Sequence, residues 1–342
     1  MLILGLETSC DETAAAVVED GTRVLSNVIA SQIDIHKEYG GVVPEVAARS
    51  HIEVVLPVIH EALDTADVTW DDIDGIAVTA GPGLFGSLLI GTLTARTIAL
   101  VRQKPLYAVN HVVAHTFANM LIGQPPQFPL LSLSASGGHS HLLYFESPLE
   151  YKLLGRTRDD AAGEAFDKVA KMLGLPYPGG PSISVAAPHG DERKYRLPTA
   201  DLRGTFDFSF SGLKTAVLRT LQTEVGGDFR TPSTDLASRL TVTQVNDMAA
   251  SFQRTACETL AGTLKRAYSQ YQPKSVVIAG GVAANTRLRQ EVSRQIPVEM
   301  HYAPMEYCTD NGAMIAALGY HLALAKRPTD PLLLKTDPSL AV

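Results

Sequence analysis

The hydrophobic pattern of this chain indicates two copies of one structural unit. Residues 2–19 and residues 129–146 each read as an apolar strand, a turn of small and polar residues, and a second apolar strand. Each hairpin is followed later by a short apolar run that ends in glycines and opens a helix, at residues 76–83 and 276–285. The hairpins lie 127 positions apart and the glycine breaks 199 apart, so the second copy has about 72 additional residues. This order of elements predicts two related lobes with a cleft between them.

Between these landmarks, apolar residues recur every three or four positions, which is typical of helices that pack on a sheet. Residues 43–63 show this pattern in the first half, and a mainly helical insertion spans about residues 160–268 in the second half. The fold class is therefore predicted to be α/β. We expect an N-terminal lobe over residues 1–128, a C-terminal lobe over residues 129–325, and a loosely held tail over residues 326–342.

Composition narrows the class of protein. Of 342 residues, 45% are hydrophobic, 19% charged and 6% aromatic, which fits packed α/β layers and argues against a disordered or fibrous chain. The net charge of −7 argues against a protein that binds nucleic acid unaided through a broad basic face. We find no apolar run that reaches the roughly 18 to 20 residues a membrane helix needs. The N-terminus lacks the basic flank of a signal peptide. We therefore expect a soluble, cytoplasmic protein.

Two glycine-containing turns are candidate phosphate sites, because such turns expose backbone N–H groups. The turn Ser136-Gly137-Gly138-His139 would let a ligand approach the backbone closely, although an ordinary hairpin turn explains it as well. Gly280, Gly281 and Asn285 follow a buried strand and precede a helix, where open α/β sheets bind ligands. The alternative is a strand-to-helix connection that needs glycine for steric reasons.

A pair of histidines is a candidate metal site. His111 and His115 are four residues apart, so on a helix both imidazoles project from one face and could share an ion. The alternative is two polar side chains that pack at a helix start. Asp310, at the predicted start of the last helix, is a candidate third ligand or simply an N-cap, and as a ligand it would make the ion bridge the lobes. Val112 stands where the metalloprotease motif has its catalytic Glu, so a protease mechanism lacks its base.

Three acidic residues are further candidates. Asp11 and Glu12 lie on the first hairpin turn and could act as a base or steer an amine, although turn residues are often acidic for local hydrogen bonding. Asp167 lies on a predicted helix and could accept hydrogen bonds from a ribose, or it could be an ordinary surface carboxylate.

Nine motifs in order resemble the tRNA adenosine threonylcarbamoyltransferase family, once described as glycoproteases. The resemblance runs from residue 1 to about residue 325. The motifs are GLETSCDET, GGVVPEVAARSH, AGPGLFGSLLIG, NHVVAH, SGGHS, AGEAFDKVAKMLGLPYPGGP, FSFSGLKT, AGGVAAN and YCTDNGAMIA. The resemblance implies a duplicated two-lobe actin-like or Hsp70-like fold (the ASKHA, RNase H-like fold) with a helical insertion in the second lobe.

The resemblance also implies a reaction and its ligands. A threonylcarbamoyl group would pass from threonylcarbamoyl-AMP to N6 of the adenosine 3′ of the anticodon (position 37), in tRNAs that read ANN codons. Asp11 or Glu12 is our hypothesis for the group that assists proton removal. One divalent metal per subunit, Fe(2+) with Zn(2+) as the alternative, would be held by His111, His115 and Asp310. The adenylate would be bound by Ser134, Ala135, Ser136, Gly137, Gly138, Asp167, Gly180 and Asn285.

Partners and a departure from the family pattern follow from the same resemblance. The implied partners are tRNA, a smaller paralogous subunit of the same fold and a small ATPase subunit, with no membrane partner. The helix over residues 43–63 is either a docking face for a partner or an ordinary core helix. Some relatives carry an acidic residue that contacts the ribose, where this chain has Ser184.

Two other functions are kept as alternatives. An ATP-dependent phosphotransferase or ATPase of the actin-like fold would bind ATP at the glycine turns and would have no use for His111 and His115. A non-catalytic nucleotide-binding scaffold would bind the adenylate without transferring anything to tRNA.

Overall fold

The computed structural model describes residues 1–39, 41–200, 202 and 204–342. Gly40, the first residue of the motif GGVVPEVAARSH, lies outside the described residues. The chain forms two compact units, each described here by itself. Unit 1 comprises residues 1–127, 147–150 and 301–342, and unit 2 comprises residues 128–146 and 151–300.

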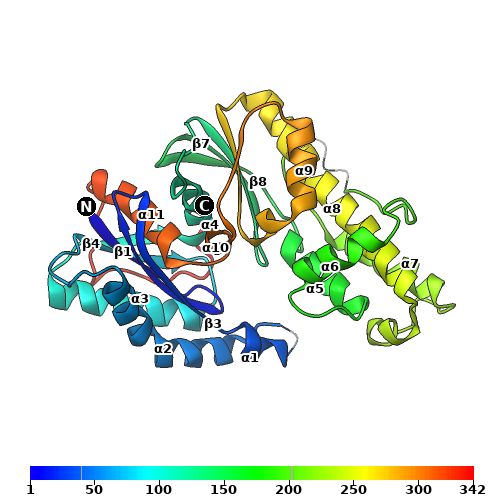
Figure 1. Cartoon of the computed structure of the whole chain (residues 1–342), viewed down its shortest axis with the longest axis horizontal. Coiled ribbons are helices and arrows are strands. Elements are labelled where there is room, and N and C mark those ends of the chain that lie inside the picture. Colours follow the sequence, from blue (N-terminus) through cyan, green and yellow to red (C-terminus); the bar gives the residue numbers. More distant parts are fainter. Residues whose placement is uncertain (40, 201, 203) are drawn as a thin grey trace. The chain divides into compact units, whose positions relative to one another are not determined.

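Unit 1 is built on a mixed five-stranded sheet (Figure 1). The central strand β1 pairs antiparallel with β2 and parallel with β4, and β4 pairs parallel with β5. The strand order is β3 (Arg23–Ser31), β2 (Glu12–Glu19), β1 (Leu2–Glu7), β4 (Gly75–Gly81) and β5 (Leu106–Asn110). The helices of unit 1 that precede residue 128 are α1 (Ile33–Lys37), α2 (Pro44–Thr65), α3 (Phe85–Arg102) and α4 (His111–Phe117).

Alternate residues of β1 face different helices, as the two-residue period of a strand requires. Leu4 and Leu6 join the core cluster that includes residues of α2 and α3. Gly5, one position along, faces α11 (Gly312–Leu324), and a Cβ on Gly5 would collide with the backbone of Gly312. Glycine at this position therefore allows the last helix to lie directly against the central strand.

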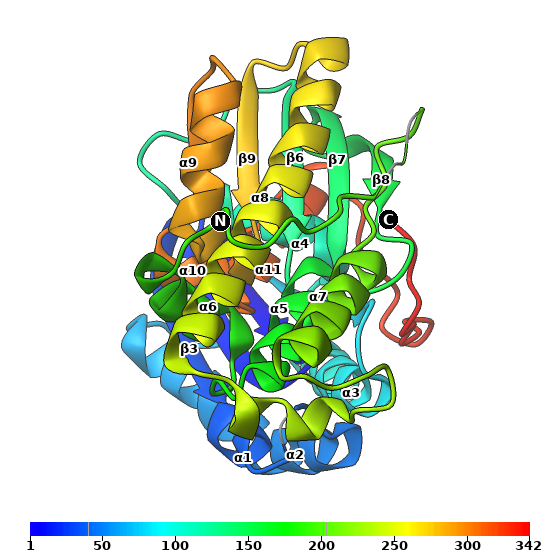
Figure 2. The same cartoon turned by 90° about the vertical axis from the view of Figure 1, so that its right-hand side faces the viewer.

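A second five-stranded sheet with the same pattern lies mainly in unit 2, which includes only Met300 of its edge strand β10. The order is β10 (Met300–Tyr302), β9 (Ser275–Ala279), β6 (Leu130–Ala135), β7 (Ser140–Ser147) and β8 (Glu150–Arg156). As in the first sheet, the central strand β6 pairs antiparallel with the next strand, β7, and parallel with a later strand, β9. Figure 2 shows β9, β6, β7 and β8 side by side.

The hydrogen-bond register confirms the duplication. Ile3 pairs with Val18 in unit 1, and Leu130 pairs with Phe145 in unit 2. Adding 127 to the residue numbers of the first pair gives the second pair, which is the spacing expected from the hydrophobic pattern. The partners of Ile3 and Leu130 on the parallel strands β4 and β9 lie 200 positions apart, one more than the glycine breaks suggested.

Helices fill the segment between β8 and β9, where the insertion was expected. The buried rings of Phe166 on α5 and Phe252 on α8 pack edge to face, with centroids 4.9 Å apart. The helices of this segment are α5 (Ala162–Met172), α6 (Gly179–Ala186), α7 (Ser211–Glu224) and α8 (Val242–Tyr271), and α9 (Thr286–Gln295) follows β9.

The C-terminal segment belongs to unit 1. We expected residues 129–325 to form one lobe. After α10 (Met305–Cys308), however, helix α11 packs on β1, β2 and β4, and the contacts group residues 301–342 with unit 1. The expectation of a loosely held tail is wrong. Thr329 N donates to Leu106 O at 2.7 Å, Asp337 N donates to Ala80 O at 2.9 Å, and Leu334 is buried.

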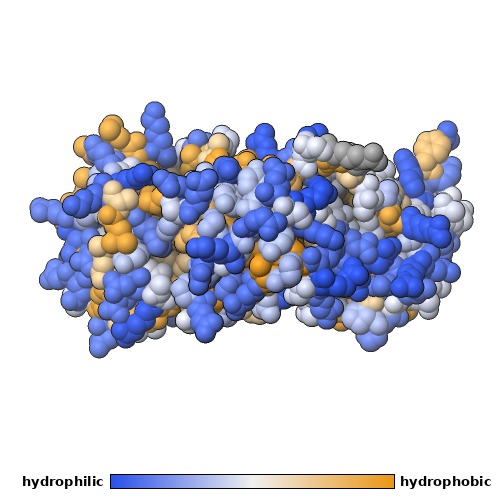
Figure 3. Space-filling view, turned by 90° about the horizontal axis from the view of Figure 1, so that it is seen from above, coloured by the Kyte–Doolittle hydropathy of each residue, from blue (hydrophilic) through white to orange (hydrophobic). Residues whose placement is uncertain are grey.

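Helix α3 is, among the described helices, the one that is long and apolar enough to cross a membrane by length and composition alone. In the structure it packs on β4 and α2, and its Gly91 lies against Thr8. These are the contacts of a helix that packs on a sheet. The face of the molecule drawn in Figure 3 is mainly hydrophilic, with hydrophobic residues in separate groups.

Candidate functional site

The two histidines lie on a helix that begins at the carboxyl end of β5. The side chain of Asn110 accepts hydrogen bonds from Val112 N and Val113 N, so helix α4 begins immediately after the strand. This cap places His111 and His115 on successive turns, with ring centroids 4.7 Å apart and ring planes at 75°. The helical spacing predicted for the pair is confirmed.

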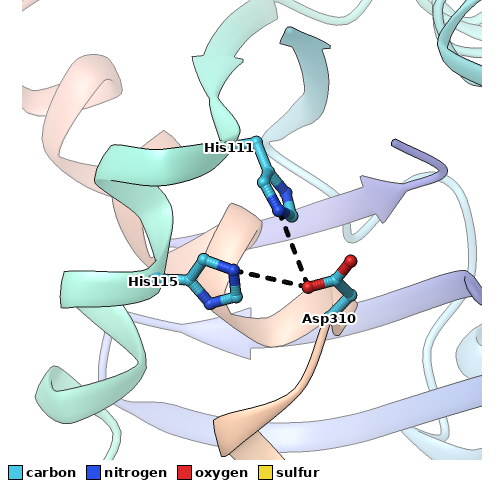
Figure 4. A group of neighbouring side chains, drawn as sticks. All are labelled: His111, His115 and Asp310. Atoms are coloured by element: carbon cyan, nitrogen blue, oxygen red, sulfur yellow. Dashed lines mark ion pairs between the residues drawn. The ribbon is translucent and has the colours of Figure 1, made fainter. Parts of the chain in front are cut away.

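Asp310 approaches both imidazoles from the segment before α11. Its Oδ1 atom lies 3.3 Å from His115 Nε2 and 3.6 Å from His111 Nε2. Figure 4 shows both rings pointing toward the same carboxylate oxygen. One ligand atom from each of the three residues lies within 4.8 Å of the others, the only such group of three His, Cys, Asp or Glu among the described residues. Two imidazole nitrogens and one carboxylate oxygen are donor types that bind transition metals such as zinc.

The alternative role of Asp310 as a helix cap is wrong. The N-cap of α11 is Asn311, whose side chain accepts a hydrogen bond from Met314 N at 3.0 Å. The expectation that Asp310 would contribute from the opposite lobe also differs from the structure. All three side chains belong to unit 1, because α11 returns to the first sheet.

The burial of His115 tests whether these residues fit a metal ion. The side chain is fully buried, and neither ring nitrogen makes a hydrogen bond within the part of the chain that the structure describes. Its Nε2 atom is close to Asp310 but does not have hydrogen-bond geometry. A buried polar atom without a partner is costly, and a cation bound to Nε2 would satisfy it. The donor set therefore fits a divalent metal, and it suits iron or zinc equally.

Glu7, which the sequence interpretation did not select, lies beside His111. It ends strand β1 and is fully buried. Its Oε2 atom accepts a hydrogen bond from Thr79 Oγ1 at 2.6 Å and lies 3.0 Å from His111 Nδ1. The available signal was a carboxylate at the end of the otherwise apolar strand LILGLE, because a charge buried there needs a partner.

Charges around His111 favour its positive form. Burial acts to lower the pKa of His111, but the carboxylates of Glu7 and Asp310 outweigh burial and raise the pKa to about 9. Burial acts to raise the pKa of Glu7, and the charge and hydrogen bond of His111 outweigh it, so that this pKa is lowered. The surroundings of the imidazoles are therefore rich in negative charge and favour a cation.

The two candidate bases lie beside the end of β1: Asp11 in the turn that follows it and Glu12 at the first residue of β2. Asp11 is buried, and Glu12 accepts a hydrogen bond from Ser31 Oγ at 3.3 Å. Burial, followed by the charges of Asp310 and Asp11, raises the pKa of Glu12 to about 10. Glu12 is thus an electrostatic neighbour of Asp310, one of the three candidate metal ligands.

The second predicted turn lies in unit 2 at the end of β6. Ser134 and Ala135 end that strand, and Ser136 N donates to His139 O at 2.8 Å to close the turn. A Cβ on Gly137 or Gly138 would meet no atom within 4 Å. Glycine is therefore not required here by packing, and the backbone of the turn is open to a ligand.

Asp167 has a local role that the sequence interpretation did not anticipate. Its Oδ1 accepts a hydrogen bond from Gly179 N at 2.7 Å, which fixes the start of α6. Burial raises the pKa of Asp167, and this hydrogen bond opposes the rise. Gly180, the next residue of α6, has open space where a Cβ would stand.

Asn285 and Ser184 meet at one further residue, Gln253, which the sequence interpretation missed. Asn285 Nδ2 donates to Gln253 Oε1 at 2.9 Å, and Ser184 Oγ donates to the same oxygen at 3.0 Å. No periodic or motif signal marks Gln253, because it lies in the interior of the long helix α8. A cavity of about 570 Å³ opens at these side chains; its lining includes Ser184, Glu192, Gln253, Arg254, Asn285 and Arg287.

Comparison with known proteins finds a family model that matches most of the chain. Residues 23–317 match the model of TsaD, described as tRNA N6-adenosine threonylcarbamoyltransferase. The chain is 51% identical over 324 residues to the tRNA N6-adenosine threonylcarbamoyltransferase of Symbiobacterium thermophilum, covering 94% of this chain and 91% of the relative. It is 48% identical over 342 residues to that of Dehalococcoides mccartyi, covering 100% and 99%.

Solved structures with lower sequence identity share the fold. HypF of T. kodakarensis gives a TM-score of 0.62 at 16% identity, covering 97% of this chain and 49% of that chain. The activator of the 2-hydroxyisocaproyl-CoA dehydratase from Clostridium difficile gives a TM-score of 0.52 at 14% identity, covering 96% and 97%. The duplicated actin-like α/β fold expected from the resemblance is confirmed.

Proposed function

This chain belongs to the tRNA N6-adenosine threonylcarbamoyltransferase family, and from that premise we propose that His111, His115 and Asp310 hold a metal ion at its catalytic centre. The protein transfers a threonylcarbamoyl group to N6 of an adenosine in tRNA. The alternatives of a phosphotransferase and of a non-catalytic scaffold are therefore wrong. The observation that supports the metal site is the meeting of three ligand atoms within 4.8 Å of one another, with both histidines buried.

The donor and acceptor of the proposed reaction are threonylcarbamoyl-AMP and the adenosine at position 37 of tRNAs that read ANN codons. The N6 amine attacks the carbamoyl carbonyl carbon, the bond from that carbon to the phosphate oxygen breaks, and AMP leaves with the electron pair. Asp11 or Glu12 accepts the proton that N6 loses, and Glu12 does so only in its ionised form, which its raised pKa disfavours. A bound divalent cation supplies positive charge that stabilises the negative charge developing on oxygen. Because an adenine amine is a poor nucleophile, positioning contributes strongly to the rate.

We propose that unit 2 binds the adenylate part of the donor. The residues concerned are Ser134, Ala135, Ser136, Gly137, Gly138, Asp167, Gly180 and Asn285. Open space beside the glycines of the turn and beside Gly180 supports this proposal, because a phosphate can reach backbone N–H groups there. Asp167 contributes by fixing the start of the helix that carries Gly180, and Asn285 faces the cavity that Ser184 also lines.

The proposed metal is Fe(2+), with Zn(2+) as the alternative. We propose that the protein acts in the cytoplasm with tRNA, a smaller paralogous subunit of the same fold and a small ATPase subunit, without a membrane partner. Helix α2 is the proposed docking face for one of these subunits. Its exposed Ile52 and Leu56, one turn apart on the same side, support that role.

Replacement of His115 tests the metal site. We expect His115→Ala to contain less than a tenth of the wild-type metal, and to lower single-turnover transfer from threonylcarbamoyl-AMP to unmodified tRNA by about 1000-fold. Metal content is measured by elemental analysis of purified protein. His60→Ala, which removes an exposed histidine on α2, is the control and should keep its metal. Wild-type metal content in His115→Ala would contradict the site.

A further inference from the structure

The two ring nitrogens of His111 face different carboxylates. Nδ1 lies 3.0 Å from Glu7 Oε2, and Nε2 lies 3.6 Å from Asp310 Oδ1. Ser9 Oγ also approaches Nδ1, at 3.2 Å. Glu7 therefore lies on the side of the ring away from the proposed metal ligands, and its own oxygens are not part of the group of three.

An imidazole that binds a metal must offer a lone pair on one nitrogen, while its other nitrogen carries the hydrogen. An ionised carboxylate can only accept a hydrogen bond, so the nitrogen that faces Glu7 is the one that carries the hydrogen. We propose that Glu7 is a positioning residue that holds His111 in the Nδ1–H tautomer and thereby presents the Nε2 lone pair to the metal. This inference rests on the proposed metal site.

The carboxylate of Glu7 is itself held rigidly. Thr79 Oγ1 donates to Oε2 at 2.6 Å, and Ser9 N donates to Oε1 at 2.5 Å. Glu7 and Thr79 lie near the ends of β1 and β4, which are adjacent parallel strands at the centre of the sheet. Because both oxygens are fixed from this scaffold, the direction of the hydrogen bond to His111 is fixed as well.

His115 provides an internal contrast. Its Nδ1 atom is buried and has no hydrogen-bond partner in the described part of the chain. The carboxylate therefore orients one member of the histidine pair and not the other. Loss of Glu7 is expected to disturb the tautomer of His111 while leaving His115 as it is, and a general loss of packing would not have this selectivity.

Metal titration of the full chain tests the proposal. The metal-free protein is titrated with Co²⁺ and with Zn²⁺ in competition with a chelator. We expect Glu7→Gln to weaken binding of both ions by about 10- to 100-fold, the usual effect of removing such a carboxylate. Thr13→Val is the matched control, because it removes the 2.7 Å hydrogen bond to another buried histidine of unit 1, His51. The control should bind both ions within about twofold of wild type.

A second variant covers the case in which Glu7→Gln does not fold. Thr79→Val removes one donor to Glu7 while leaving the carboxylate in place, and we expect it to weaken Co²⁺ binding by about threefold. Wild-type affinity in Thr79→Val and in any folded Glu7→Gln would overturn the role of Glu7.

Nitrogen-15 NMR of the imidazoles separates this proposal from the metal site on which it rests. In metal-free wild type we expect the neutral form of His111 to carry hydrogen on Nδ1, and in Glu7→Gln a mixture with the Nε2–H tautomer. The same tautomer in both proteins would overturn the positioning role even if the metal binds. Failure of wild type to bind either ion, with the expected change of tautomer intact, would instead overturn the metal site.

Discussion

The central strands of the two units have the same hydrogen-bond register, but the side chains at their carboxyl ends differ in chemical type. Glu7 in unit 1 and Ser134 in unit 2 are equivalent positions, since they are 127 residues apart, and both are fully buried. Glu7 accepts a hydrogen bond from Thr79 and contacts His111. Ser134 Oγ has no hydrogen-bond partner within the described ranges. The two copies therefore share a backbone arrangement but differ in the side chain at the end of the central strand, which is acidic in unit 1 (Glu7) and an uncharged serine in unit 2 (Ser134).

The turns that follow these strands differ in the same way. Asp11 and Glu12 in unit 1 correspond to Gly138 and His139 in unit 2 by the same 127-residue offset. The first turn and the start of β2 carry two acidic side chains, and burial followed by the charge of nearby Asp310 raises the pKa of Glu12. The second turn leaves open space beside Gly137 and Gly138, where we propose that the phosphate of the adenylate binds. Substitutions that exchange or remove these differences measure how far each unit depends on its own chemistry.

The largest effect is expected when unit 2 is given the charge of unit 1. Ser134→Glu places a carboxylate in a fully buried position that lacks the partners of Glu7, so the free energy of unfolding should fall by about 4 kcal/mol or more. Urea denaturation followed by circular dichroism measures this. Ser134→Ala removes an oxygen without a described partner and should change stability by less than about 1 kcal/mol. Equal stability of Ser134→Glu and wild type would show that unit 2 can accommodate a charge there.

A smaller effect is expected at His141, whose equivalent in unit 1 is Ala14. Burial, and then the charge of Arg156, lowers the pKa of His141 to about 4. Because the folded pKa lies below the unfolded value of about 6.5, the stabilisation is complete above pH 6.5 and is lost as the pH falls toward 4. The loss over this window should reach up to about 3 kcal/mol.

The variant His141→Gln isolates this contribution from the carboxylates that also titrate. Urea denaturation at pH 7.5, 5.5 and 4.5 should show wild type losing more stability on acidification than His141→Gln. Parallel loss in both proteins would mean that His141 is readily protonated in the folded state.

The smallest effect on stability is expected at the glycine turn itself. Gly137→Ala adds a Cβ that meets no atom within 4 Å at a residue whose φ is not left-handed, so stability should change by less than about 1 kcal/mol. Because the methyl group would occupy the space proposed for the phosphate, we expect AMP to bind about tenfold more weakly by calorimetry. Gly163→Ala is the contrasting control, since its Cβ would collide with the backbone of Gly137 and should destabilise the fold. Unchanged AMP affinity in Gly137→Ala would remove the turn from the proposed site.

The sequence predicted those parts of the site that depend on local spacing. The pair His111 and His115 follows from the helical repeat, and the open turn at Gly137 follows from its two glycines. Glu7 was missed because its importance depends on Thr79 and His111, which come from two other elements. Gln253 was missed for the same reason, since Ser184 and Asn285 reach it from separate helices. A hydrogen bond between distant residues leaves no periodic trace in the sequence.

The alternation and repeat of apolar residues by themselves determined the two hairpins, the 127-residue duplication and the helical insertion, because each depends on neighbours within a few positions or on a copy of the same pattern. The tertiary structure alone decided that Asp310 joins unit 1. Asn311 rather than Asp310 caps α11, and the small residues Gly5 and Gly312 let that helix lie against β1. Contacts between segments some 300 residues apart are fixed by packing of complementary surfaces, and local propensity does not encode which surfaces will meet.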